Sequence, residues 1–105
     1  MDVNGKSPLS FLWRMGYIEA MYVAIEFNPS AFKHDITESA IRQTIINAIY
    51  DDVLDDLANK HLLIGFDNNG NLLEIMYNVI DDQSVNVFHA MKCRSIYYRL
   101  LSAGN

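Results

Sequence analysis

The chain contains few of the residues that cross-link or interrupt a polypeptide: one cysteine, two prolines and five glycines among 105 residues. Cys93 has no second cysteine with which to form an internal disulfide or a metal cluster. We therefore predict a reducing compartment and a packing role for its side chain. No apolar run approaches the roughly 20 residues needed to cross a bilayer. We expect a cytoplasmic protein without membrane contact.

Several chemical signatures are also missing from the sequence. It has no Walker loop, no Gly-x-Gly-x-x-Gly motif and no serine at the centre of a nucleophile elbow. Nucleotide-cofactor enzymes and serine hydrolases therefore have no support. The three histidines are 27 and 28 residues apart, which does not suggest a metal site. We expect neither a metal nor a cofactor.

Negative charge dominates the composition, with 8 Lys and Arg against 13 Asp and Glu and a formal net charge of −5. Such a balance argues against a general nucleic-acid coat protein. The distribution is uneven, because Lys92, Arg94 and Arg99 follow the last acid, Asp82. This pattern is compatible with a local basic patch on an acidic body. The aspartates at 51, 52, 55 and 56 indicate a solvated helix end and turn or, as the alternative, a divalent-cation site.

Half of the residues are apolar, which is enough for one compact core in a chain of this length. The first twenty residues fit the rest poorly, since residues 4–8 are loop-like and no clean amphipathic period begins before Met21. We predict that residues 1–20 are an extension, partly helical or mobile, or the product of an upstream start codon. Residues 21–105 form the predicted α+β domain.

Strand and helix signals occur in a regular order within this domain. Residues 22–27 alternate and are rich in β-formers, which indicates a first strand. Asn28 followed by Pro29 predicts a short helix that ends at His34. Thr37 can cap the next helix, whose apolar face is predicted at Ile41, Ile45, Ala48 and Ile49.

Four later segments have the pattern of a strand meander: residues 53–57, 60–66, 72–80 and 84–91. Asn69-Gly70 is the strongest turn signal, because this pair accepts the positive φ angles of tight hairpins. Asp81-Asp82 marks the next reversal, and a helical pattern returns after Met91 with Ile96, Leu100 and Leu101 as its apolar positions. The predicted fold is α+β: a strand, two helices, a three- to four-stranded antiparallel meander and a C-terminal helix, with the helices on one face of the sheet.

Residues 32–40 resemble the Lys-His-Gly-Val-Ser-x-Glu-x-Ala element that opens the second helix of BrnT-like toxins, a branch of the RelE/ParE superfamily. The stretch from Leu62 through Leu72-Leu73-Glu74 to His89-Ala90-Met91 is similar to the sheet of these toxins. Cys93-Arg94 stands where their Ala-Arg leads into the last helix. The similarity spans residues 23–101 and depends on the order and spacing of the motifs.

The resemblance implies a metal-independent endoribonuclease, the toxin half of a type II toxin–antitoxin pair. Such enzymes make the 2'-hydroxyl attack the adjacent phosphorus, which requires a base, an acid for the leaving 5'-oxygen, and cations for the phosphorane charge. The implied partners are an antitoxin protein and RNA, free or bound to the ribosome, and the chain could form a homo-oligomer. By resemblance, Arg94 is the phosphate clamp, and Lys33 and His34 match the Lys-His pair beside it.

The residues themselves add candidates to this site. His89 continues an alternation with Val85 and Val87 on the core side, so it is either a hydrogen-bonded structural histidine or a general acid or base. Glu74 lies among apolar residues on a predicted strand, where it would orient Arg94 or act as the base.

The C-terminal tyrosines complete the set. Tyr97 and Tyr98 cannot both point inward, and Tyr98 is one turn from Arg94 and can share its face. The outward ring could stack on a base or donate a proton. We predict that the catalytic residues are His89, Arg94, Glu74 and Tyr98. The predicted RNA-binding residues are Lys33, His34, Lys92 and Arg99.

Three departures from the family pattern support a second hypothesis. Asp35 replaces the Gly that ends the short helix, although Asp tolerates the left-handed conformation better than most residues. Ser95 replaces a second basic residue after Arg94, and the net charge is more negative than that of ribonuclease toxins. The alternative is a noncatalytic toxin-like module that binds protein. A third hypothesis is a gyrase-directed toxin like the ParE branch.

Overall fold

The computed structural model describes residues 24–102. The elements are β1 (Ala24–Phe27), the 3₁₀ helix η1 (Pro29–Phe32), α3 (Glu38–Ile46), β2 (Ala48–Asp55), β3 (Lys60–Phe66), β4 (Leu72–Asp81), β5 (Ser84–Lys92), the 3₁₀ helix η2 (Ser95–Tyr97) and α4 (Tyr98–Ser102). The predicted extension over residues 1–20 lies outside the described residues and stays a prediction. No helix in the described part of the chain is long and apolar enough to cross a membrane.

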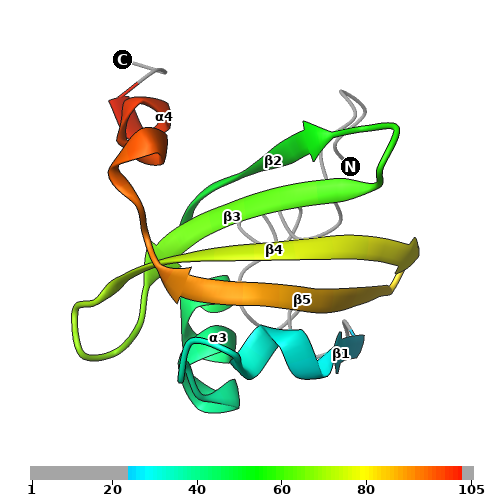
Figure 1. Ribbon diagram of the computed structural model, residues 1–105, viewed down its shortest axis with the longest axis horizontal. Helices are drawn as coiled ribbons and strands as arrows, with labels where there is room; N and C mark the ends of the chain where they lie inside the picture. The colour runs from blue at the N-terminus through cyan, green and yellow to red at the C-terminus, as the bar shows by residue number, and fades with distance from the viewer. Residues whose placement is uncertain (1–23, 103–105) are drawn as a thin grey trace.

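The strands form one five-stranded mixed sheet in the order β1-β5-β4-β3-β2 (Figure 1). β2 to β5 are an antiparallel meander, as the sequence predicts. β1 lies at the edge beside β5 and runs parallel to it, with Ala24 opposite Ser84 and Phe27 opposite Val87. The sheet is therefore larger than the three to four strands predicted. The added strand, β1, is itself predicted at residues 22–27, but its pairing with a segment about sixty residues away is not revealed by local periodicity.

Side-chain caps fix the starts of the first two helical segments. The Asn28 side chain accepts a hydrogen bond from Ser30 N at 3.0 Å and opens η1, which ends earlier than the predicted His34. The Thr37 hydroxyl oxygen accepts a hydrogen bond from Ala40 N at 3.1 Å, which confirms it as the N-cap of α3. Between them, Asp35 has a φ of 65°, the left-handed conformation predicted where the BrnT-like pattern has Gly.

The prediction for the end of α3 is wrong. The helix stops at Ile46, and Ala48 and Ile49 belong to β2 instead of the helix face. β2 accordingly spans Ala48–Asp55 and not residues 53–57. Apolar residues at these positions fit both a helix and a strand, and pairing with β3 satisfies the backbone polar groups of this segment.

The two faces of the sheet carry separate hydrophobic clusters. Leu63 of β3 joins Ile41 and Ile45 of α3 on one face, whereas Leu62 and Ile64 pack on the other. The second face is covered by side chains of the C-terminal segment, namely Tyr97, Leu100 and Leu101. α3 and α4 therefore lie on opposite faces (Figure 1), and the prediction of helices on one face is wrong. A strand that is apolar at consecutive positions needs cover on both sides.

The turn between β3 and β4 follows its prediction. Gly70 has a φ of 80°, and Asp67 Oδ1 accepts hydrogen bonds from Asn69 N and Asn71 N, each at 2.9 Å. These bonds, with that from Asn71 Nδ2, lower the pKa of the Asp67 carboxyl. The ionised side chain thus holds the reversal that brings β4 back along β3.

Gly65 allows α3 to approach β3 closely. A Cβ atom at this position would lie 2.7 Å from the carbonyl oxygen of Thr44 and 2.9 Å from the Cα of Ala48. Both are backbone atoms, one in the last turn of α3 and one at the start of β2, so the clash cannot be relieved by a side-chain rotation. The spacing between helix and sheet therefore requires a glycine, which has no side chain, at position 65.

We expect Gly65→Ala to lower the free energy of unfolding by about 1–3 kcal/mol, because α3 must move away from the sheet. Urea denaturation followed by circular dichroism measures the change. Gly70→Asn is the matched control: a Cβ there meets nothing within 4 Å, and since Asn tolerates positive φ the cost should stay below about 1 kcal/mol. Equal stability of Gly65→Ala and the parent would contradict the close approach.

Candidate functional site

The candidate site is built around Glu74, the third residue of β4, which is fully buried. Its neighbours Leu73 and Ile75 point into the cluster under α3. Because successive side chains of a strand alternate, Glu74 points to the opposite face, which the C-terminal segment covers. A carboxylate in such surroundings requires charged or hydrogen-bonding partners.

Arg94 provides most of these partners. Its backbone N donates to Oε1 of Glu74 at 2.9 Å, Nη2 donates to Oε2 at 2.5 Å, and Nε lies 3.1 Å from both oxygens. Arg94 is also the N-cap residue of η2, so this contact fastens the entry to the C-terminal segment onto the centre of the sheet. The guanidinium side chain is still 44% exposed and therefore accessible to a ligand.

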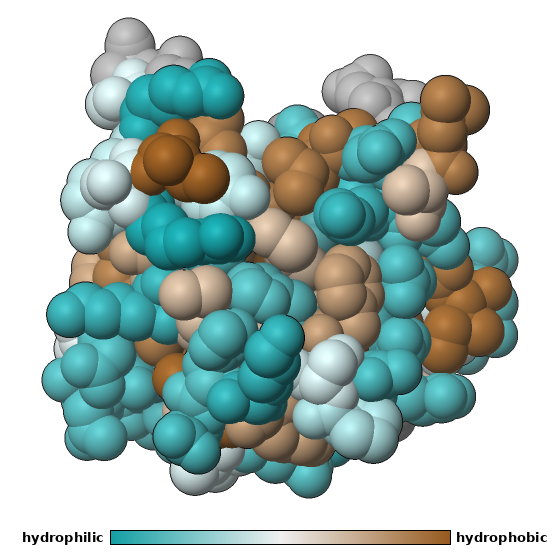
Figure 2. Space-filling view, in the orientation of Figure 1, coloured by the Kyte–Doolittle hydropathy of each residue, from teal (hydrophilic) through white to brown (hydrophobic). Residues whose placement is uncertain are grey.

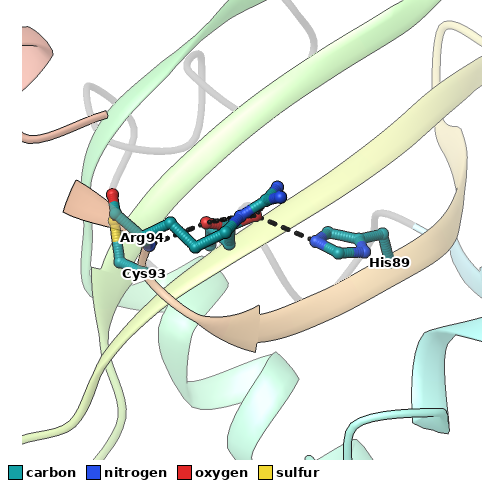
Figure 3. A network of polar contacts seen from close by, with 4 residues as sticks. His89, Cys93 and Arg94 are labelled. Atoms are coloured by element: carbon teal, nitrogen blue, oxygen red, sulfur yellow. Dashed lines mark hydrogen bonds and ion pairs between the residues drawn. The ribbon is translucent and has the colours of Figure 1, made fainter. Parts of the chain in front are cut away.

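His89 reaches the same carboxylate from β5, as Figure 3 shows. Its Nε2 lies 2.9 Å from Oε2 of Glu74, and the side chain is 20% exposed. An ionised carboxylate only accepts hydrogen bonds, so we assign the proton to Nε2. In the neutral ring the lone pair is then on Nδ1.

A β-bulge sets the direction of His89. Val87 pairs with Tyr77, but the next pairing joins His89 to Met76, so Phe88 is an extra residue in β5. Val87 therefore points under α3, whereas His89 points to the opposite face with Met76. The prediction that His89 continues the core-facing alternation is wrong. One inserted residue reverses the phase of a strand, and the sequence pattern does not mark the insertion.

The electrostatics identify Glu74 as an anchor. Burial on its own would raise the pKa of this carboxyl, but the hydrogen bonds from Arg94 and His89 outweigh burial and bring the pKa below its ordinary value. The same contact raises the pKa of Arg94. A buried carboxylate with both oxygens engaged is a poor proton acceptor for a substrate. Of the two roles predicted for Glu74, the geometry supports orientation of Arg94.

His34 brings a second imidazole to the cluster. Its ring centroid lies 5.6 Å from that of His89, and the rings meet edge to face at 78°. His34 belongs to the loop after η1, and this segment is fastened to β5 where Ser30 Oγ donates to the carbonyl oxygen of Phe88 at 2.6 Å. The structure therefore places the His of the Lys-His element directly against His89. The sequence predicts only that this element lies near Arg94.

The aromatic ring beside Arg94 is Tyr97, whose centroid lies 5.5 Å from the guanidinium carbon. Tyr98 is 50% exposed, whereas Tyr97 packs on the second cluster, so one ring does point inward as predicted. Residues 95–97 form a 3₁₀ helix, which has three residues per turn. The side chain one turn after Arg94 is therefore that of Tyr97, at position i+3, and not that of Tyr98, at position i+4. The sequence analysis missed this contact because it assumed an α-helix. The catalytic role of Tyr98 stays a prediction.

The remaining predicted RNA-binding residues divide into two groups. Lys33 directly precedes His34, and Lys92 ends β5 two residues before Arg94; both are exposed and lie close to the Glu74 cluster along the chain. Arg99 is in α4, which contacts β2. Burial raises the pKa of Tyr50 in β2, and the positive charge of Arg99 offsets part of this rise. In the sheet, β2 is separated from β5 by two strands.

Cys93 is 4% exposed within the second hydrophobic cluster, which confirms its packing role. The prediction of a solvated helix end for the aspartate burst is wrong for Asp51. This residue is in β2, is buried and accepts a hydrogen bond from the Tyr77 hydroxyl at 2.5 Å. His61 stacks on Tyr77 with centroids 5.0 Å apart, on the face opposite to His89. Across residues 24–102, no three His, Cys, Asp or Glu side chains are arranged to hold a metal ion.

Comparisons with protein-family models, curated proteins and solved structures found no match to this chain. The chemistry of the Glu74 cluster is therefore the basis for a functional assignment. The cluster consists of one buried carboxylate, one guanidinium and two imidazoles: Glu74, Arg94, His89 and His34. A guanidinium binds anions and imidazoles transfer protons near neutral pH, so the cluster is suited to acid–base chemistry on a phosphate.

We expect Glu74→Gln to lower the free energy of unfolding at pH 7 by about 1.5–3 kcal/mol, because it removes the charge that holds Arg94 and His89. The pKa of Glu74 is lower in the folded state. Its stabilisation is therefore complete above the ordinary glutamate pKa of about 4.3 and is lost as the pH falls through the folded pKa. Urea titrations from neutral to acidic pH should show the two proteins converging in stability below that range.

Glu38→Gln is the matched control for this substitution. Glu38 also contacts an arginine, Arg42, at 2.9 Å, but both side chains are about half exposed. Its loss should cost less than about 0.5 kcal/mol. A stability difference between the parent and Glu74→Gln that stays constant into the acidic range would show that Glu74 acts through shape and not through charge.

Proposed function

We propose that this chain is a metal-independent endoribonuclease and the toxin component of a type II toxin–antitoxin pair, with a RelE/BrnT-like fold. The observation that carries the proposal is a buried carboxylate that holds one arginine and one histidine, with a second histidine packed against the first. These residues come from three segments of the chain: the loop after η1, the end of β5 and the start of η2. The Lys-His element and the Arg after β5 are the positions by which the sequence resembles BrnT-like toxins.

Arg94 binds the scissile phosphate in this proposal. Glu74 engages Nε and Nη2, and because the side chain is 44% exposed its outer edge is free to hold phosphate oxygens. The ion pair with Glu74 fixes the guanidinium before substrate arrives, so little side-chain freedom is lost on binding. The fixed positive charge then stabilises the phosphorane as its negative charge develops.

His89 is the general base. Its Nε2 donates to Glu74, which leaves Nδ1 to accept the proton of the 2'-hydroxyl. The buried carboxylate holds the ring in this tautomer and stabilises the imidazolium that forms, as the carboxylate of a Ser-His-Asp triad does for its histidine. Glu74 itself does not touch the substrate and is a positioning residue.

A separate observation favours the alternative, a noncatalytic module that binds protein. Exposed apolar side chains occur at the end of the sheet where the β2–β3 and β4–β5 turns lie: Val53, Leu54, Leu57 and Ile80. Asn59 ties the β2–β3 turn to β4: its Nδ2 donates to the carbonyl oxygen of Val79 at 2.8 Å, and its Oδ1 accepts from Val79 N at 3.0 Å. Figure 2 shows apolar side chains on this side of the molecule. An antitoxin partner is expected under both hypotheses.

Cleavage of total RNA in the presence of EDTA tests the enzyme hypothesis. We expect the purified parent protein to cut RNA, and the Arg94→Ala, His89→Ala double variant to be at least about 100-fold slower, because it lacks the phosphate clamp and the base. The matched control is an Arg42→Ala, His61→Gln double variant, which removes the same residue types from α3 and from the opposite face of the sheet. It should cut like the parent.

Circular dichroism establishes that each variant is folded before its activity is compared. Equal loss of activity in both double variants would show that the effect is not specific to the Glu74 cluster. If the folded parent protein cuts neither free nor ribosome-bound RNA, the enzyme hypothesis fails and the binding module becomes the better assignment.

A further inference from the structure

We infer that His34 is the general acid of this reaction, so that the site is a two-histidine centre that leaves a 2',3'-cyclic phosphate and a 5'-hydroxyl. The inference rests on the proposed ribonuclease function and assigns a role that the Lys-His motif alone does not give. It depends on the contact between the two imidazoles, 5.6 Å between ring centroids, across two separate segments of the chain.

The geometry of phosphoryl transfer requires two proton-transferring groups. The attacking 2'-oxygen and the leaving 5'-oxygen lie on opposite sides of the phosphorus, so one imidazole cannot serve both. His34 and His89 are neighbours but come from different directions, one from the loop after η1 and one from β5. Arg94 and His89 share the Glu74 carboxylate and His34 packs against His89, so a phosphate bound at Arg94 would have a proton acceptor beside it and a proton donor next to that acceptor.

The other members of the cluster are unsuited to protonate the leaving group. Arg94 keeps its proton, because the hydrogen bond to Glu74 raises its pKa above an already high value. Glu74 is buried and its pKa is lowered below the ordinary value, so it carries no proton to give. Tyr97, which lies outside the Glu74 cluster, packs against the guanidinium of Arg94 and the second hydrophobic cluster. His34 is exposed, and it is the second histidine of the cluster besides His89. Histidine is the side-chain type that exchanges protons near neutral pH.

The order of the two roles follows from Glu74. Because Nε2 of His89 donates to the Glu74 carboxylate, Nδ1 carries the lone pair and is the atom that gains the proton. When His89 becomes an imidazolium, its charge lies next to that of His34, and this repulsion favours release of the His34 proton. Uptake at one ring therefore promotes donation from the other within the same step.

The step balances without any further reactant. The 2'-hydroxyl proton passes to Nδ1 of His89, and the bond between O2' and phosphorus forms. The bond between phosphorus and O5' breaks with its electron pair on O5', which takes a proton from the His34 imidazolium. Afterwards His89 loses its proton and His34 regains one from solvent, which restores the starting state.

The test uses two RNA oligonucleotides of one sequence, cut by the parent, with either oxygen or sulfur as the 5'-bridging atom at the scissile bond. A thiolate leaves without protonation, so the sulfur substrate does not need a general acid. We expect His34→Ala to cut the oxygen substrate at least about 100-fold more slowly than the parent. It should cut the sulfur substrate within about threefold of the parent rate.

His89→Ala provides the contrast, because loss of the base should slow cleavage of both substrates. His61→Gln is the control histidine, on the opposite face of the sheet, and should cut both substrates like the parent. His34 is exposed, so its replacement is not expected to disturb folding. Mass spectrometry of the products reads the two ends, where a cyclic phosphate and a 5'-hydroxyl are expected.

The outcomes separate this inference from the proposed function. If the parent cuts RNA but His34→Ala is equally slow on both substrates, His34 binds or supports structure and the inference is overturned, while the ribonuclease function stands. Full activity of His34→Ala, or products with a 5'-phosphate, overturns it too. A folded parent that cuts neither oligonucleotide nor total RNA removes both the function and the inference.

Discussion

The rest of the structure depends on the contact of Glu74 with Arg94 and His89. A carboxylate at the centre of a sheet is costly to desolvate, and this one keeps its charge because a backbone N–H, a guanidinium and an imidazole donate to it. Those donors belong to β5 and to the start of η2. The contact therefore decides where the chain leaves the sheet, and so how the C-terminal segment closes the second hydrophobic cluster.

The same contact couples stability to chemistry. Arg94 and His89 are held in place before a ligand arrives, which is what a preorganised anion site requires. Under the proposed function, Glu74 positions the catalytic groups and also holds a structural element, so substitutions at Glu74 would act on both properties.

The sequence predicts those features that depend on local chemistry. The Thr37 cap, the left-handed Asp35, the turn at Gly70 and the strands β3 to β5 follow from side-chain hydrogen bonds, φ preferences and periodicity. It does not predict the parallel pairing of β1, the start of β2 or the bulge at Phe88, because each depends on contacts distant in the chain. In the site, the sequence predicts that Glu74 orients Arg94, but it does not predict that His89 shares the same carboxylate or that His34 packs against His89.

The proposal that an acidic chain acts on RNA requires a physical explanation, and the layout of β4 provides one. Asp81 and Asp82 stand at the far end of this strand, and Asp81 is seven residues beyond Glu74, which corresponds to about 23 Å. The Debye length at physiological ionic strength is about 8 Å, so a phosphate at Arg94 is largely screened from those acids. Binding under this proposal depends on contacts within the Glu74 cluster and not on the net charge of −5.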